Sequence, residues 1–266
     1  MRKLILSAAM AAISLSLLIP PPGAGASPAR MRVSGRHTML PAEVPLVANV
    51  KDYGATGNGR TNDAPSINKA IRAVAAAGGG TVVLPAGTYL SGSIRLMSHI
   101  HLVLSPGAIL QATSEIKAYD KAEPNPWDHY QDYGHSHWHN GFIWGEDLVN
   151  VSITGTGMIF GKGLTRNHAS DSLPVGLGDK AIALKNCRDV VLRDFSIYHG
   201  GHFGILATGV DNLRIDHLTI DTNRDGMDID ACRNVTITGC QVKSPWDDGI
   251  CLKSSFALGY ARATEN

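Results

Sequence analysis

The chain has 266 residues, of which 44% are hydrophobic, and its 24 Lys and Arg against 23 Asp and Glu give a formal net charge of +1. This composition fits one sizeable globular domain and excludes a disordered or fibrous protein. The near-zero net charge argues against a nucleic-acid partner, because nucleic-acid binders are strongly basic.

Residues 1–26 have the pattern of a secretory signal peptide. Arg2 and Lys3 precede an apolar run over 4–19, and small residues before Ser27 supply a cleavage site. An uncleaved membrane anchor is the alternative, but the run is shorter than the ~20 residues that a span needs. We therefore expect a secreted or periplasmic protein without membrane association after cleavage, with an irregular lead-in over 27–46.

The next segment predicts a capped end. A short strand is expected from Val47, and an amphipathic helix over 64–77, in which apolar residues recur at helical spacing, ends at three glycines, 78–80. A glycine-rich stretch before a helix can also bind phosphate, but the spacing matches neither the P-loop nor the dinucleotide fingerprint. We interpret the helix as a cap on one end of the fold.

Four later segments share a polar residue followed by alternating apolar and polar residues. They are 150–153, 189–192, 212–215 and 234–237. The last three begin 23 and 22 residues apart, a period typical of solenoid coils. A leucine-rich repeat has a similar period, but its leucine signature and helical half are missing. The repeats predict an all-β fold, a right-handed parallel β-helix with an N-terminal capping helix, as a single domain over 47–266.

Two aspartate-bearing segments, 224–227 and 247–250, align with each other at an offset of one coil, and 202–205 aligns one coil earlier. Neighbouring strands of a parallel sheet are about 4.8 Å apart. We therefore expect Asp225 to lie over Asp248, Arg224 over Asp247, and His202 one rung further along, in a cleft.

Carboxylates this close raise the pKa of one member, which suits a group that donates a proton near neutral pH. Paired carboxylates of this kind catalyse glycoside hydrolysis. The alternatives are calcium ligation, or a solvated acidic turn neutralised by Arg224 and Lys253.

The segments containing Asp225 and Asp247-Asp248 resemble the Asn-Thr-Asp-Gly and Gly-Asp-Asp motifs of the polygalacturonase family, glycoside hydrolase family 28. The resemblance implies cleavage of α-linked galacturonic acid polymers of pectin with inversion. It also implies that Asp247 is the general acid while Asp225 and Asp248 activate water; we expect no cofactor and no metal. Arg224 replaces the family's threonine and Trp246 its glycine, which resembles bacterial exo-acting or divergent members.

Four residues are candidate substrate contacts: His202, Arg224, Lys253 and Trp138. Trp138 lies in a loop rich in aromatic residues that also carries His135, His137 and His139, side chains that suit stacking on sugars. A metal site is another interpretation of these histidines, but no acid cluster accompanies them. A plain surface loop is the favoured interpretation.

The family's Gly-His-Gly and Arg-Ile-Lys motifs, which help to organise the site and bind the substrate carboxylate, have no counterpart before Asn266. The last four residues resemble the start of another rung. We therefore expect an incomplete β-helix from a longer reading frame, a monomer that binds pectic polysaccharide and is poorly active alone. A β-helix polysaccharide lyase and a non-catalytic carbohydrate-binding β-helix are the alternatives.

Overall fold

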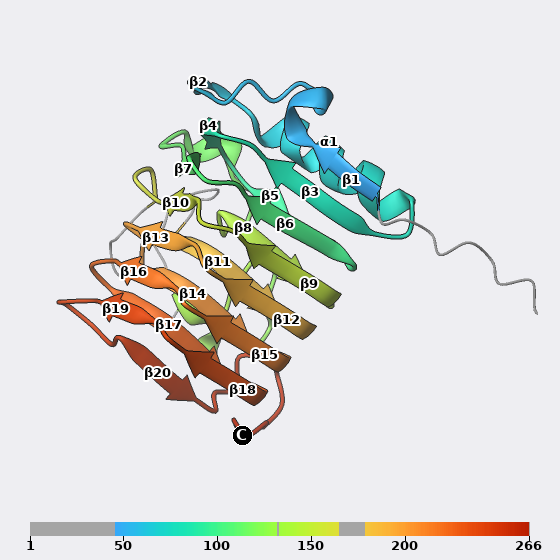
Figure 1. Ribbon diagram of the computed structural model, residues 1–266. Helices are drawn as coiled ribbons and strands as arrows, with labels where there is room; N and C mark the ends of the chain where they lie inside the picture. The colour runs from blue at the N-terminus through green and yellow to red at the C-terminus, as the bar shows by residue number, and fades with distance from the viewer. Residues whose placement is uncertain (1–45, 132, 165–178, 266) are drawn as a thin grey trace, which may run out of the picture. The chain divides into compact units, whose positions relative to one another are not determined.

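The structure is a computed structural model that describes residues 46–131, 133–164 and 179–265. The predicted signal peptide, and the predicted lead-in except for its last residue, lie outside these ranges. No helix in the described ranges is long and apolar enough to cross a membrane. From β1 onward the chain winds through three parallel sheets in turn (Figure 1).

Each sheet collects one strand from each successive rung. The first sheet contains β1 (Leu46–Asn49), β3 (Gly80–Leu84), β6 (Ile100–Leu104), β9 (Val149–Thr154), β12 (Arg188–Arg193), β15 (Asp211–Asp216) and β18 (Arg233–Thr238). The second contains β2 (Asn58–Asn62), β4 (Gly87–Ser91), β7 (Ala108–Ala112), β10 (Met158–Phe160), β13 (Ser196–Tyr198), β16 (Thr219–Asp221) and β19 (Gln241–Lys243). The third contains β5 (Ile94–Arg95), β8 (Ile143–Glu146), β11 (Lys180–Lys185), β14 (Phe203–Thr208), β17 (Asp225–Asp230) and β20 (Ile250–Lys253).

The register of the first sheet follows the repeats of the sequence. Val151, Val190, Leu213 and Val235 are neighbours in successive strands. Because side chains alternate between the two faces of a strand, this register turns one apolar residue of every rung toward the core. The predicted parallel β-helix is confirmed.

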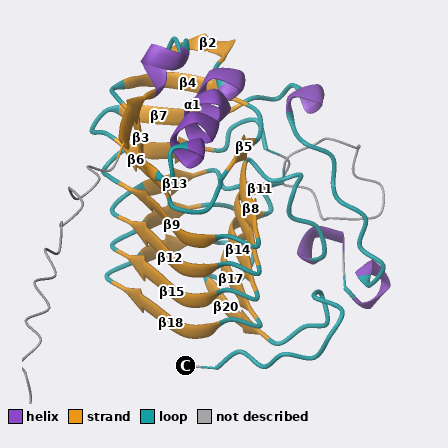
Figure 2. Ribbon diagram, turned by 90° about the vertical axis from the view of Figure 1, so that its right-hand side faces the viewer, coloured by secondary structure: helices purple, strands orange, loops and turns teal. Residues whose placement is uncertain are grey.

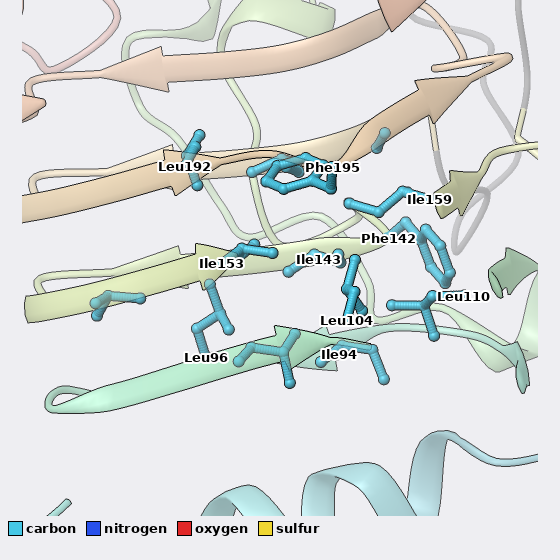
Figure 3. Packing of buried hydrophobic residues seen from close by; sticks show 14 of the residues in the cluster. Ile94, Leu96, Leu104, Leu110, Phe142, Ile143, Ile153, Ile159, Leu192 and Phe195 are labelled. Carbon is cyan, nitrogen blue, oxygen red and sulfur yellow. The ribbon is translucent and has the colours of Figure 1, made fainter. Parts of the chain in front are cut away.

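Apolar side chains from all three sheets fill the interior (Figure 3). Ile94 pairs with Ile143 in the third sheet, and Leu110 pairs with Ile159 in the second, and all four are fully buried. Burying one such side chain contributes about 1.5–3 kcal/mol. The fold is therefore stabilised by many similar contacts between adjacent rungs.

The helix α1 (Ala64–Ala76) lies at the end of the solenoid that the chain forms first (Figure 1). It buries Ile67, Ile71 and Val74 and contacts β1, β3 and β5. The predicted capping helix is confirmed in position and in its buried face. Covering this end shields core residues and strand edges that would otherwise be exposed.

The opposite end is less covered. Ile250 and Leu252, whose equivalents on β17 are buried, are 47% and 62% exposed, and β20 is the outer strand of its sheet. Glu265 forms an isolated parallel bridge with Arg233 of β18.

Four short 3₁₀ turns complete the elements: η1 (Val50–Tyr53), η2 (Ile116–Ala118), η3 (Asp128–Tyr130) and η4 (Tyr133–His135). The last three belong to the long connection between β7 and β8. Figure 2 shows this connection running along the outer side of the third sheet. It therefore covers part of the face that carries the aspartates.

Glycines occupy the corner where the last three rungs enter the third sheet, namely Gly204, Gly226 and Gly249. A Cβ atom on Gly226 would lie 2.4 Å from both the carbonyl oxygen of Gly249 and Cγ1 of Val242. Because Gly226 and Met227 both face inward, Asp225 and Asp228 lie together on the outer side.

We expect Gly226→Ala to lower the free energy of unfolding by about 1–3 kcal/mol, because the added methyl group must displace backbone atoms of the next rung. Gly249→Ala is the matched control: its Cβ would lie 3.8 Å from the nearest atom, Cγ1 of Val242. Its cost should stay within about 0.5 kcal/mol. Urea unfolding followed by circular dichroism measures both, and equal midpoints would contradict the steric role of the corner.

Candidate active site

The register of β17 and β20 brings the aspartate segments together. Met227 pairs with Ile250, and the backbone N–H of Gly226 donates to the carbonyl oxygen of Asp248 at 2.9 Å. Asp225 therefore occupies the rung directly beside Asp248. The predicted alignment of the two segments is confirmed.

The three predicted catalytic carboxyl groups form one cluster. One oxygen atom from each of Asp225, Asp247 and Asp248 lies within 4.8 Å of the other two. Asp225 is only 4% exposed, whereas Asp247 and Asp248 are exposed. The cluster thus has one buried and two accessible members.

Asp225 and Asp247 share a hydrogen bond and titrate in opposite directions. Burial, followed by the negative charge of Asp228 and the contact with Asp247, raises the pKa of Asp225 to about 7. Burial also raises the pKa of Asp247, but the hydrogen bond from Asp225 and the charge of Arg224 outweigh it and hold this pKa below its usual range. Near neutral pH the pair therefore holds one proton, which rests on Asp225 and is donated to Asp247.

Arg224 stabilises the ionised member of the pair. Its Nη2 lies 2.6 Å from Oδ2 of Asp247, and its side chain is 17% exposed. The predicted position of Arg224 over Asp247 is confirmed. The guanidinium binds a protein carboxylate in this structure.

Lys253 also contacts an acid of the protein. Its Nζ lies 2.7 Å from Oδ2 of Asp228, a fully buried residue of β17. Burial lowers the pKa of the Lys253 ammonium group, but the hydrogen bond and charge of Asp228 raise the pKa above its ordinary value. The ammonium group is therefore charged and held by Asp228.

His135 reaches the same carboxylate from the long loop. Its Nε2 lies 2.8 Å from Oδ2 of Asp228 and 2.5 Å from Nζ of Lys253. One nitrogen atom cannot serve both partners at once. It donates to Asp228 when it carries a proton and accepts from Lys253 when it does not.

The interpretation of this loop as a plain surface loop is wrong. His135, His137 and Trp138 are 8%, 4% and 0% exposed. Trp138 packs on Phe203 and Leu206, and its Nε1 donates to Oγ1 of Thr208 at 3.1 Å. The predicted substrate contact of Trp138 is therefore also wrong, because a fully buried indole ring has no face free for a sugar.

His202 lies beside the cluster but beneath the surface. It is 3% exposed and its ring stacks on Phe203, with centroids 4.2 Å apart and an interplanar angle of 3°. Its charge helps to lower the pKa of Asp247. His202 therefore acts on the site through its charge, and its side chain exposes almost no surface that a substrate could contact.

Some of these atoms are spaced closely enough to hold a cation. Beside the three-aspartate cluster, one ligand atom each of His135, Asp225 and Asp228 lies within 4.8 Å of the others. Arg224 and Lys253 already place positive charge at hydrogen-bond distance from the acids. Arg224, Lys253 and the proton on Asp225 thus compensate Asp247, Asp228 and Asp225, which leaves the carboxyl group of Asp248 as the fourth acid of the site.

Sequence reasoning missed Asp228 and His135. The position of Asp228 could have been predicted from the sequence. Residues 226 and 227 both face the core, so residue 228 faces outward on the same side as residue 225. His135 gave no such signal, because its loop comes 93 residues before Asp228 in the chain.

Comparisons with known proteins agree with the fold. A family model described as rhamnogalacturonase A/epimerase, pectate lyase-like matches residues 47–254. The "Probable polygalacturonase" of Vitis vinifera is 27% identical over 241 residues, covering 82% of this chain and 47% of the grape protein. The family 28 exopolygalacturonase of Yersinia enterocolitica has a TM-score of 0.67 at 22% identity, covering 84% of this chain and 48% of that chain.

PfbA, a surface adhesin of Streptococcus pneumoniae, has a TM-score of 0.53 at 23% identity, covering 77% of this chain and 51% of that chain. The two structural likenesses show the fold alone, which an adhesin and a glycosidase share. The chain spans about half the length of these relatives. The resemblance to polygalacturonases is confirmed, and because the family model covers most of the chain, the protein belongs to the rhamnogalacturonase A/epimerase, pectate lyase-like family.

Proposed function

We propose that the protein is a glycoside hydrolase that cleaves α-linked galacturonic acid polymers of pectin by acid/base catalysis. The observation that carries this proposal is the cluster of Asp225, Asp247 and Asp248, whose carboxyl oxygens lie within 4.8 Å of one another, with the pKa of Asp225 raised and that of Asp247 lowered. Hydrolysis of a glycosidic bond needs one carboxyl group that gives a proton and another that accepts one.

The two roles follow from exposure and charge. Asp247 is accessible, so we assign it the contact with the glycosidic oxygen; Asp225 is its buried proton store. When Asp247 passes a proton to the leaving oxygen, the proton of Asp225 has moved to Asp247 along their hydrogen bond. Asp225 is then a carboxylate with a raised pKa, and therefore a good base.

The water reacts on the other side of the cleaved bond. Asp225 or Asp248 removes one proton from it, and its oxygen forms a bond to the anomeric carbon as the glycosidic bond breaks. One water molecule is consumed: its OH group ends on the anomeric carbon of one product, and a proton ends on the leaving oxygen of the other. The proton taken from water restores the one that Asp225 and Asp247 share. No redox partner is needed.

The substrate class rests on the relatives. The grape protein and the Yersinia enterocolitica enzyme are named polygalacturonases, and the family description includes rhamnogalacturonase A. Pectic polymers lie outside the cell, which agrees with the signal peptide expected over 1–26. We therefore propose a secreted or periplasmic monomer that acts on pectic polysaccharide.

The lyase alternative is less well supported by the described residues. A lyase removes a proton from carbon with a basic side chain, which must be uncharged to act. Lys253 is held as an ammonium ion by Asp228, and Arg224 is paired with Asp247. Lys253 and Arg224 are thus in the wrong state for that reaction.

Asp247→Asn should lower kcat on polygalacturonate by about 10²- to 10⁴-fold, because the amide cannot donate the proton. Asp221→Asn is the control, since Asp221 is a partly exposed aspartate outside the cluster that pairs with Lys243 at 3.2 Å. Reducing-end assays measure both variants, and circular dichroism confirms folding. Equal rates in the two variants would refute the hydrolase assignment.

The rate should depend on the proton of Asp225. Its pKa of about 7 predicts that kcat falls as the pH rises through about 7, because the pair then loses the proton that reaches the glycosidic oxygen. At low pH the rate should fall again as Asp247 becomes protonated. A pH–rate profile measures both limbs, and a flat profile between pH 6 and about 8.5 would contradict this assignment.

The stability of the fold should depend on the same proton, so it provides a measurement of the Asp225 pKa that is independent of the reaction rate. A carboxyl group whose folded-state pKa is raised contributes stability that is present below its unfolded value, about 3.9, and is lost as the pH rises through about 7. Asp225→Asn removes this dependence. Relative to the wild type, the variant should therefore gain thermal stability as the pH rises.

The resemblance implies inversion at the anomeric carbon, and we expect the first product to be the β-anomer. The carboxyl oxygens lie within 4.8 Å, closer than the roughly 6.5–9.5 Å typical of inverting enzymes and the roughly 5–5.5 Å of retaining ones. The separation therefore does not decide the outcome. Proton NMR of fresh hydrolysate does, and an initial α-anomer would show retention.

A further inference from the structure

A buried ionic group lies directly beside the shared proton. Asp228 is fully buried, and the same oxygen of its carboxylate, Oδ2, contacts Nζ of Lys253 at 2.7 Å and Nε2 of His135 at 2.8 Å. Burying a carboxylate away from water costs free energy unless a nearby positive charge compensates it. Lys253 supplies that positive charge, and His135 contacts the same carboxylate oxygen from a separate part of the chain.

Asp228 connects this group to the proposed chemistry. Its carboxylate lies within 4.8 Å of that of Asp225, because both residues flank the inward pair 226–227. The charge of Asp228 raises the pKa of Asp225, and the charge of Lys253 opposes it. The two effects therefore meet at the residue that holds the shared proton.

We propose that Lys253 and His135 are positioning residues that act through Asp228 to fix the place and the charge environment of Asp225. This role differs from the substrate contact that the sequence predicted for Lys253. The effect on reaction rate rests on the proposed hydrolase function, whereas the effect on the titration of Asp225 does not.

Charged and titratable groups from four parts of the described chain surround Asp225 and Asp228. The segment of Asp225 contributes Arg224 and Asp228, and the segment before β20 contributes Asp247 and Asp248. Strand β20 contributes Lys253 and Cys251, of which Cys251 pairs with Asp228; the long loop contributes His135, and His202 precedes β14. Lys253 is the cation that binds Asp228, the fully buried acid among these groups.

The long loop has other attachments that do not involve His135. Glu123 accepts hydrogen bonds from the backbone N–H groups of Trp138 and His139, and Asn125 donates to the carbonyl oxygen of Ser136 at 2.8 Å. Substitution of His135 is therefore expected to leave the loop in place. This separates its contribution to the site from its contribution to folding.

The deciding experiment is titration of the aspartate carboxyl groups by carbon NMR in the full chain, with Asp225→Asn used to assign the signal. In Lys253→Met, proton uptake by the cluster of Asp225 and Asp228 should move upward by about one pH unit or more, because a nearby cation is lost. Lys253→Arg keeps the charge and should restore most of the wild-type curve.

Lys243→Met is the matched control on the neighbouring strand β19, since Lys243 is 72% exposed and pairs with Asp221 away from the cluster. Its titration curve should match that of the wild type. His135→Ala gives a second route if Lys253→Met does not fold, and should also change the titration. Unchanged curves in a folded Lys253 or His135 variant would overturn the proposal.

Kinetics separate positioning from substrate binding. Lys253→Met should lower kcat by about 10- to 100-fold and displace the pH–rate profile with little change in KM, whereas loss of a substrate contact would raise KM. A raised KM with an unchanged pH profile would refute the positioning role. If the wild type hydrolyses no pectic polymer, the proposed function fails, and the NMR titration still decides this inference.

Discussion

Parallel hydrogen bonding between successive rungs is the constraint on which the rest of the structure depends. It holds neighbouring strands about 4.8 Å apart and fixes which residues face each other. The bond from Gly226 to the carbonyl oxygen of Asp248 is one link in this series, and it sets two distant segments side by side. The core and the acid cluster therefore follow from the same register, with apolar residues on the inner face and carboxyl groups on the outer one.

This register concentrates negative charge, and the site contains the means to balance it. Arg224 compensates Asp247, Lys253 compensates Asp228, and a proton neutralises Asp225. The three forms of compensation differ in one respect that matters for chemistry. The two cations are fixed to the chain, while the proton can leave and return, so the proton is the group that the proposed acid/base reaction would transfer.

Much of the fold could be predicted because its information is local and periodic. The alternation around Val190 and Leu213 and the helical spacing of Ile67 and Ile71 each specify an element and its buried face. The role of the long loop could not be predicted, because the sequence between β7 and β8 has no period. Whether Trp138 faces solvent or Phe203 is decided by how the loop folds back onto the third sheet, and that is a tertiary property.

The corner between the second and third sheets has a consequence for how such a site arises. On β11, β14 and β17 the same two outward positions hold Lys180 and Ala183, then Phe203 and Leu206, then Asp225 and Asp228. The backbone is repeated while the chemistry changes from one coil to the next. Point substitution at these two positions can therefore change the chemistry of a coil while its backbone stays the same.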